Sequence, residues 1–216
     1  MPHFFTDRRK GVSLGAYESL NLGFHVGDDP SAVTANRASL GKTQFMNQVH
    51  GDVVVVIDHL LDYEPRCDAL ITTNKDVSLA VMVADCIPLL LISDKAVAAV
   101  HVGRAGLVNK VALKALHQMR ELGAIDIHAV LGPSICGRCY EVPLELQQEV
   151  VAVHPRALST TYKGTPGLDL SAGLIADLAA EGISYDASVI CTIEEPLYFS
   201  HRRDNPTGRF AGVVSL

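Results

Sequence analysis

Cysteine and histidine side chains stand beside hydrophobic runs in the first half of the chain. His50 precedes the run VVVVI, Cys86 follows SLAVMVAD, and His101 lies near the end of AVAAVHV. Side chains at the ends of neighbouring strands can converge at one edge of a sheet even when they are distant in sequence. Four interpretations are open: core packing, a nucleophile with its base, a metal site, or part of an anion site.

The metal interpretation rests on the chemistry of these three side chains. Two imidazoles and one thiolate suit zinc, and three protein ligands leave a fourth position for water or substrate, as in catalytic zinc sites. A loose series of His50, Cys86 and His101 also occurs by chance, because buried cysteines and hydrogen-bonded histidines are common in protein cores. The spacing of the three residues alone does not decide between a metal site and ordinary core packing.

Glycines follow the second histidine. Gly103 and Gly106 in HVGRAGLVNK lie at the start of an amphipathic segment. Free backbone N–H groups and the helix dipole favour an anion at such a position. The alternative is a tight turn from strand to helix that needs glycine for steric reasons.

A metal-free hydrolase is the main alternative from another class. Cys86 as thiolate, His101 as base and a helix N-terminus as oxyanion support would suit attack on an amide. His50 discriminates, because a dyad leaves it without a function whereas a zinc site requires it. A zinc-binding module without turnover is a third hypothesis.

The elements that position these residues are predicted from hydrophobic periodicity. Continuous apolar runs predict strands buried on both faces, at 52–57, 78–84, 88–93 and 96–102. Asp94 and Lys95 predict a tight hairpin between two of them, hence a mixed sheet.

Helices are expected around this sheet. Periodicity and caps predict them from Pro30 through Arg37, from Leu107 to Gly123, from Pro143 to His154, and over 170–183 with Ser171 as cap. The segments ASVICT, PLYFSHRR and GRFAGVVSL predict final strands. Because no linker interrupts this order, we predict one domain over 1–216, a three-layer α/β/α sandwich with a mixed β-sheet.

Composition restricts the class of partner. The 216 residues carry a net charge of −6 and no tryptophan, which argues against a nucleic-acid partner. The apolar run 79–92 is broken by Asp85 and Pro88 and is too short to cross a bilayer. The N-terminus does not have the pattern of a secretory signal, and five cysteines predict reduced thiols, so we expect a cytoplasmic protein.

Several blocks together resemble a known family. GVSLGAYESLNLGFHVGDDPSAVTANR, NQVHG, DALITT, VADCIPLLL, HVGRAGL, GPSICGRCYEV and SHRRDNPTGRFAGVVSL are similar to the YfiH/laccase-domain family, long labelled polyphenol oxidases and now regarded as purine nucleoside phosphorylases. The resemblance implies a single α/β/α sandwich and zinc at His50, Cys86 and His101. It also implies phosphorolysis of adenosine, inosine, guanosine and methylthioadenosine, and deamination of adenosine.

Further site residues are expected if this resemblance holds. Phosphorolysis must hold a phosphate beneath the ribose, and Arg37, Arg202 and the turn Gly103–Gly106 are the candidate contacts. Asp85 and Gln48 lie beside two of the metal ligands and are expected to orient water or substrate.

The chain departs from the family pattern at two places. Where many relatives read HAGWRG, this chain reads HVGRAG, so Arg104 is a candidate substitute for the displaced arginine. Relatives often have a Cys-Cys pair before YEV, whereas Cys136 and Cys139 form a C-x-x-C here. Two thiols are too few for a structural zinc site, which favours a loop thiol pair without metal.

The laccase label makes a prediction that the sequence can test. Multicopper oxidases bind copper largely through His-x-His pairs, and no two of the nine histidines are separated by one residue. We therefore expect any copper in this protein to be adventitious, since copper outcompetes zinc for nitrogen and sulfur ligands.

Overall fold

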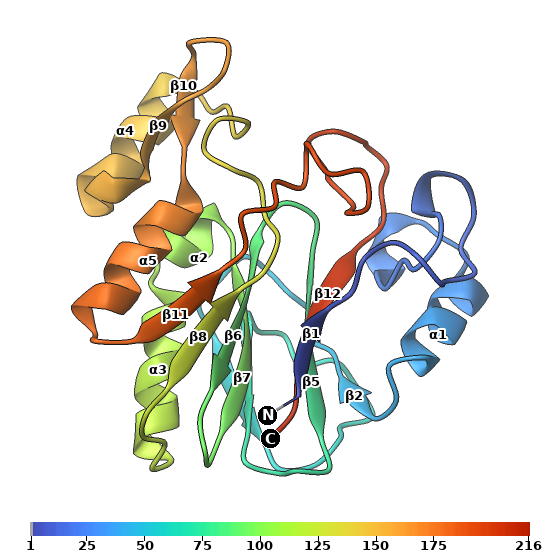
Figure 1. The fold of residues 1–216 in the computed structure, drawn as a ribbon. Coiled ribbons are helices and arrows are strands. Elements are labelled where there is room, and N and C mark those ends of the chain that lie inside the picture. Colours follow the sequence, from blue (N-terminus) through green and yellow to red (C-terminus); the bar gives the residue numbers. More distant parts are fainter. Residues whose placement is uncertain (1) are drawn as a thin grey trace.

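The computed structural model describes residues 2–216, which form two packed β-sheets with helices on their outer faces (Figure 1). The larger sheet has the strand order β11-β8-β6-β7-β4-β3. Its strands are β3 (Val54–Ile57), β4 (Ala69–Thr72), β6 (Ile87–Ile92), β7 (Val97–Val102), β8 (His128–Leu131) and β11 (Ser184–Ala187).

This sheet is mixed, as predicted. β3 pairs with β4 and β11 with β8 in parallel, whereas β6 pairs with both β7 and β8 in antiparallel register. The predicted hairpin at Asp94 and Lys95 is confirmed, because Ile92 lies opposite Val97 across it. The same register places Ile87 opposite Val102, so that Cys86 and Gly103 meet at one end of the hairpin.

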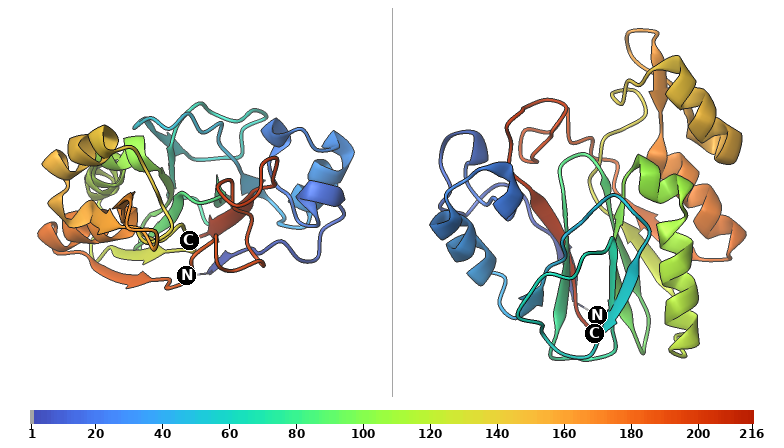
Figure 2. Two further views of the ribbon diagram at one scale, coloured as in Figure 1. Left: turned by 90° about the horizontal axis from the view of Figure 1, so that it is seen from above. Right: turned by 180° about the vertical axis from the view of Figure 1, so that it is seen from behind.

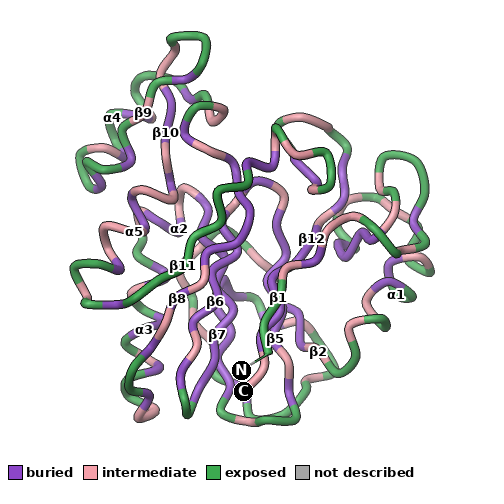
Figure 3. The backbone as a smooth tube through the Cα atoms, in the orientation of Figure 1, coloured by how far each residue is buried: buried purple, intermediate pink, exposed green. Residues whose placement is uncertain are grey.

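The second sheet has the order β1-β12-β5-β2 and consists of β1 (His3–Phe5), β2 (Thr43–Gln44), β5 (Ser78–Val83) and β12 (Phe210–Val214). Its inner face packs on the larger sheet through a buried cluster that includes Leu79, Val81, Leu90 and Phe210. Central strands of both sheets are almost wholly buried (Figure 3). The chain ends lie side by side, and the amide of Ser215 donates to the carbonyl of Pro2 at 3.1 Å.

The helices cover the two outer faces. On the larger sheet lie α2 (Arg104–Val108), α3 (Val111–Glu121) and α5 (Leu170–Ala180), with α1 (Pro30–Ala38) on the far side beyond the smaller sheet (Figure 2). α4 (Leu144–Val153) lies beyond the end of the larger sheet and packs on β10 and α2. Among the described residues, no helix is both long and apolar enough to span a membrane.

Local sequence explains where these helices begin. Asp29 caps α1 by accepting from the amide of Ser31, and Pro30 occupies the first turn, where a missing N–H costs nothing. Asp169, rather than the predicted Ser171, caps α5 by accepting from the amide of Ala172. The helix predicted from Leu107 is divided into α2 and α3, because Lys110 has a φ of 59°.

The mixed α/β class is confirmed, and three features differ in detail from the sequence-based expectation. The apolar strands divide between two sheets that pack face to face, since nearly continuous hydrophobicity does not reveal whether a helix or a second sheet covers a strand. The segment 188–192 contains no strand beyond an isolated bridge at Cys191, although ASVICT was predicted to form one. The segment 196–203 forms turns rather than a strand. The remaining elements are a hairpin formed by β9 (Leu158–Thr160) and β10 (Pro166–Leu168), and short 3-10 turns at Gly15–Tyr17, Phe24–Val26 and Pro155–Ala157.

Candidate metal centre and its pocket

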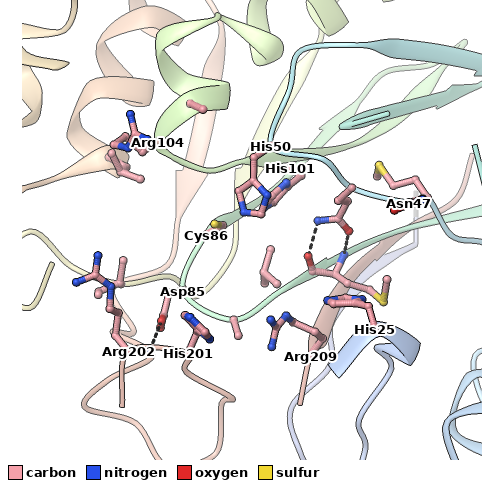
Figure 4. A pocket seen from close by; sticks show the side chains of 18 of the residues that line it. His25, Asn47, His50, Asp85, Cys86, His101, Arg104, His201, Arg202 and Arg209 are labelled. Carbon is pink, nitrogen blue, oxygen red and sulfur yellow. Dashed lines mark hydrogen bonds between the residues drawn. The ribbon is translucent and has the colours of Figure 1, made fainter. Parts of the chain in front are cut away.

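The structure brings His50, Cys86 and His101 together. Their potential ligand atoms all lie within 4.8 Å of one another (Figure 4). Cys86 immediately precedes β6 and His101 lies on β7, so the antiparallel hairpin places them side by side. His50 reaches them from the loop before β3, and its ring meets that of His101 edge to face at 4.7 Å between centroids.

Gly103 allows this convergence. A Cβ atom at Gly103 would lie 3.1 Å from the Sγ of Cys86 and 3.3 Å from the Cδ2 of His50. Gly106 is buried within α2, where a Cβ would lie 3.1 Å from the carbonyl oxygen of His101. Both glycines therefore have a packing function, and their predicted contact with an anion stays a prediction.

A buried carboxylate holds the side chain of His101 and the backbone of His50 in place. Asp68 has no exposed surface, and its Oδ1 accepts from the Nδ1 of His101 at 2.8 Å and from the amide of His50 at 3.0 Å. Its Oδ2 accepts from the amide of Gly51 at 2.7 Å. Asp68 thus leaves the Nε2 of His101 for a metal, which is the usual arrangement around ligating histidines.

The electrostatics of the cluster favour a thiolate. Burial opposes ionisation of Cys86, but the charge of His101 and hydrogen bonds from His101 and His50 outweigh it and lower the pKa of the thiol to about 6. Burial also opposes protonation of His101, yet the charge of Cys86 and the hydrogen bond to Asp68 raise its pKa to about 9. Without a metal, Cys86 and His101 therefore form a thiolate–imidazolium pair near neutral pH.

These residues fit a tetrahedral zinc ion. Zinc binds nitrogen and sulfur at about 2.0–2.3 Å, so its ligand atoms lie roughly 3.3–3.8 Å apart, within the 4.8 Å limit of this cluster. The Cys86 thiol, with its lowered pKa, loses its proton easily, as a cysteine must when it binds a metal. The fourth side of the cluster faces a pocket.

Asp68 supplies a testable prediction. In Asp68→Asn the amide NH₂ faces the backbone N–H groups of Gly51 and Val49, so two donors oppose each other and the His101 ring loses its anionic acceptor. We expect zinc affinity to fall about 10- to 100-fold. Competition with a chromophoric chelator measures this, and Asp52→Asn, whose half-buried carboxylate pairs with Lys114 and not with the cluster, serves as control. Unchanged affinity in Asp68→Asn would contradict the assigned function of this carboxylate.

The pocket beside the cluster has a volume of about 910 Å³, enough for a nucleoside with a phosphate. Its walls come from segments far apart in sequence. The polar and charged residues among its lining include His25, Arg37, Gln48, Asp85, Arg104, Tyr140, His201, Arg202 and Arg209. Sequence reasoning had identified five of these nine.

Asp85 and Gln48 hold the segments next to the cluster. The Oδ1 of Asp85 accepts from the hydroxyl of Thr192 at 2.6 Å, and its Oδ2 accepts from the amide of Arg202 at 2.8 Å. Gln48 pairs with Met82 through both ends of its amide, at 2.7 and 2.9 Å. Both side chains line the pocket as expected, and an orienting contact with substrate stays a prediction.

The backbone at the cluster is also unusual. His50 and Asp85 adopt positive φ angles of 57° and 92°, which are uncommon for residues other than glycine. Such conformations persist when the surrounding contacts hold them, and they concentrate at functional sites. Here Asp68 holds the first residue and Thr192 with Arg202 holds the second.

The pocket arginines differ in how far their charge is already paired. Arg37 donates to the carbonyl of Leu22 at 2.7 Å, forms an ion pair with Glu64, and stacks on Phe24 and Phe45. In residues 2–216 no ion pair to a carboxylate is found for Arg104, Arg202 or Arg209. Arg202 donates to the carbonyl of Glu141 at 3.0 Å. The unpaired charges therefore favour Arg104, Arg202 and Arg209 over Arg37 as contacts for an anion.

Sequence reasoning missed five residues of this site. Asp68 and Arg209 lie within the blocks DALITT and TGRFAG, but nothing in the chain shows that they reach the cluster. His25, Tyr140 and His201 also lie within quoted blocks, but nothing in the sequence indicates that they line the pocket. The sequence shows Cys136 and Cys139 only as a pair, whereas the structure places Cys191 and Glu194 beside them.

The α/β fold brings three possible metal ligands together beside a pocket. This arrangement is typical of an enzyme with a metal site. The chain belongs to the family described as multi-copper polyphenol oxidoreductase laccase, whose model matches residues 2–216. The resemblance to the YfiH/laccase-domain family is thereby confirmed.

Relatives with curated names agree with one another. The chain is 50% identical to a purine nucleoside phosphorylase of Streptomyces coelicolor, covering 99% of this chain and 95% of the relative. It is 46% identical to a purine nucleoside phosphorylase of Mycobacterium tuberculosis, covering 97% and 89%. These names differ from the oxidoreductase name of the family.

Solved structures show the same fold. A DUF152 protein of Neisseria meningitidis is 35% identical with a TM-score of 0.90, covering 99% of this chain and 93% of the other. The hypothetical protein YfiH of Bacillus licheniformis is 28% identical with a TM-score of 0.89, covering 98% and 91%.

Proposed function

We propose that this protein is a zinc-dependent purine nucleoside phosphorylase that acts on adenosine, inosine, guanosine and methylthioadenosine and that also deaminates adenosine. The observation that carries the proposal is one pocket that combines the His50, Cys86 and His101 cluster with three arginines, Arg104, Arg202 and Arg209, that form no carboxylate ion pair within residues 2–216. The names of the relatives support the same activity.

His50, Cys86 and His101 hold the zinc in this proposal. When bound, zinc supplies a Lewis acid that polarises an oxygen or lowers the pKa of water to about 7 at neutral pH. Asp68 fixes the tautomer of His101, and the low pKa of Cys86 keeps this ligand ionised.

The remaining groups bind and orient the substrates. Phosphorolysis transfers the ribosyl group from the purine to phosphate, so a phosphate oxygen must lie beneath C1′ while the base departs. Arg104, Arg202 and Arg209 surround the cluster in Figure 4 and supply donors for that phosphate. Phe24 and Tyr140 offer aromatic faces for the purine. Asp85 holds the backbone of Arg202 in position.

A metal-free hydrolase remains the second candidate, because Cys86 and His101 form an ionised pair without metal. This pair resembles the activated nucleophile of a cysteine hydrolase. His50 argues against it, since its ligand atom lies in the same cluster and a dyad gives it no function. Copper chemistry has less support, because the nine histidines contain no His-x-His pair.

Product analysis tests the proposed activity. Purified protein is incubated with inosine, and separately with adenosine, each with and without phosphate. The proposal expects hypoxanthine and ribose 1-phosphate from inosine only when phosphate is present, and inosine from adenosine under both conditions. Base release that does not depend on phosphate would instead indicate a nucleosidase. Absence of any nucleoside turnover in zinc-loaded protein would reject the proposal.

A further inference from the structure

A second group of metal-ligating side chains lies outside the pocket. Cys136 and Cys139 occupy one turn, and Cys191 and Glu194 occupy another. Their sulfur and carboxylate atoms all lie within 4.8 Å of one another. The two turns are 52 residues or more apart in sequence, so only the fold brings them together.

Both turns have the same local form. Each places two ligand-type residues three positions apart, and a backbone hydrogen bond closes each turn, from Cys139 to Cys136 at 3.0 Å and from Glu194 to Cys191 at 3.1 Å. The C-x-x-C turn is the usual two-ligand unit of structural zinc sites. A second turn with ligands at the same spacing completes a set of four.

Contacts between the turns fix their separation. The amide of Cys136 donates to the Sγ of Cys191 at 3.4 Å, and the thiol of Cys139 donates to the Oε1 of Glu194 at 3.5 Å. Ser134 and Cys191 form an isolated parallel bridge just before the two turns. A Cβ atom at Gly137 would lie 2.7 Å from the Oγ of Ser159, so this turn is packed against the β9–β10 hairpin.

We propose that Cys136, Cys139, Cys191 and Glu194 form a second metal site that holds a structural zinc ion. Three thiolates and one carboxylate are a donor set that zinc accepts, and four protein ligands leave no position for substrate. The number of protein ligands distinguishes the second site from the first, which offers three ligands beside a pocket.

The second zinc supports the wall of the nucleoside pocket. Tyr140 follows Cys139, and its amide donates to the carbonyl of Cys136 at 3.0 Å. Thr192 follows Cys191 and donates to Asp85, the neighbour of Cys86, at 2.6 Å. A metal that joins the two turns therefore fixes Tyr140 and Thr192 relative to each other without contact with substrate.

A metal count in separate variants tests this site independently of the first. In His50→Ala/His101→Ala, the first centre is disabled and zinc in the purified protein reports the second site alone. We expect wild-type protein to hold about two zinc ions per chain and this variant to keep about one. Adding Cys139→Ser should remove that ion, and Glu194→Gln should weaken it, whereas Glu195→Gln at the adjacent position should have no effect.

A second measurement covers the case in which a cysteine variant fails to fold. The His50→Ala/His101→Ala protein is loaded with Co²⁺, and thiolate-to-cobalt absorption together with protection of Cys136, Cys139 and Cys191 from alkylation is followed. The proposal expects both signals, with loss of protection after chelation. The proposal is overturned if wild-type protein holds about one zinc per chain and the histidine variant holds none. It is also overturned if alkylation of the three cysteines is equal with and without metal, or if protein purified without reductant contains a disulfide among them.

Discussion

Replacing His101 by alanine is expected to abolish zinc binding at the His50, Cys86 and His101 centre together with nucleoside phosphorolysis. Only two ligands would remain, and the carboxylate of Asp68 would be left buried without its imidazole partner. Because changes to the surroundings of a ligand already cost about 10- to 100-fold in affinity or activity, loss of the ligand itself should exceed about 100-fold. His50→Ala should behave in the same way.

The measurement pairs the metal content of each variant with its phosphate-dependent turnover of inosine. His117→Ala, on the exposed face of α3, is the matched control and should retain both. Zinc should fall by about one ion per chain in His101→Ala relative to that control. A His101→Ala protein with undiminished zinc and turnover would show that the cluster is not a metal centre.

Arg209→Ala is expected to impair phosphorolysis more than adenosine deamination. The Arg209 side chain is half-buried in the pocket wall, and among residues 2–216 it donates only to the carbonyls of Thr207 and Gly208 and forms no carboxylate ion pair. Burial lowers the pKa of its guanidinium, so an anion that contacts it is favoured. Loss of one charge-assisted hydrogen bond of about 1.5–3 kcal/mol corresponds to roughly a 10- to 100-fold lower kcat/KM for phosphate.

Arg37→Ala is the informative comparison for Arg209. The Arg37 side chain is 12% exposed and its charge is paired with Glu64, so we expect comparable losses in both assays and a less stable protein. Arg209→Lys, which keeps the charge, should recover part of the phosphate-dependent rate. Equal losses of phosphorolysis and deamination in Arg209→Ala would contradict phosphate binding by Arg209. A loss of phosphorolysis alone in Arg37→Ala would instead assign the phosphate contact to Arg37.

The proximity of His50, Cys86 and His101 could be predicted from the sequence because each stands beside a recognisable strand. Cys86 and His101 flank a hairpin whose turn residues are visible at Asp94 and Lys95, so their proximity follows from antiparallel pairing. The mixed α/β class follows from the same apolar runs. Asp68 could not be assigned, because its neighbours in sequence form a buried strand and its partners come from two other segments.

The second cluster shows why cysteine spacing alone was insufficient. Cys136 and Cys139 are visible as a pair in the sequence. Cys191 and Glu194 join them because β11 pairs with β8 in parallel and the segments that follow the two strands meet at Ser134 and Cys191. The ion pair between Arg37 and Glu64 could not be predicted either, because Glu64 lies 27 residues away in a loop. Long-range pairing of this kind leaves no periodic signal in a single chain.

The most direct test of the central claim follows Cys86 and turnover in the same samples. Site-resolved alkylation of Cys86 by mass spectrometry and phosphate-dependent release of hypoxanthine from inosine are measured in zinc-loaded protein, after chelation, and during stepwise return of zinc, with buried Cys67 as a reference thiol. A zinc ligand is shielded by its metal, whereas the metal-free thiolate with a pKa of about 6 reacts readily. The account predicts that Cys86 is protected and the enzyme active with zinc, that both properties are lost on chelation, and that both return together. Rapid labelling of Cys86 in zinc-loaded protein, or full turnover without metal, would contradict it.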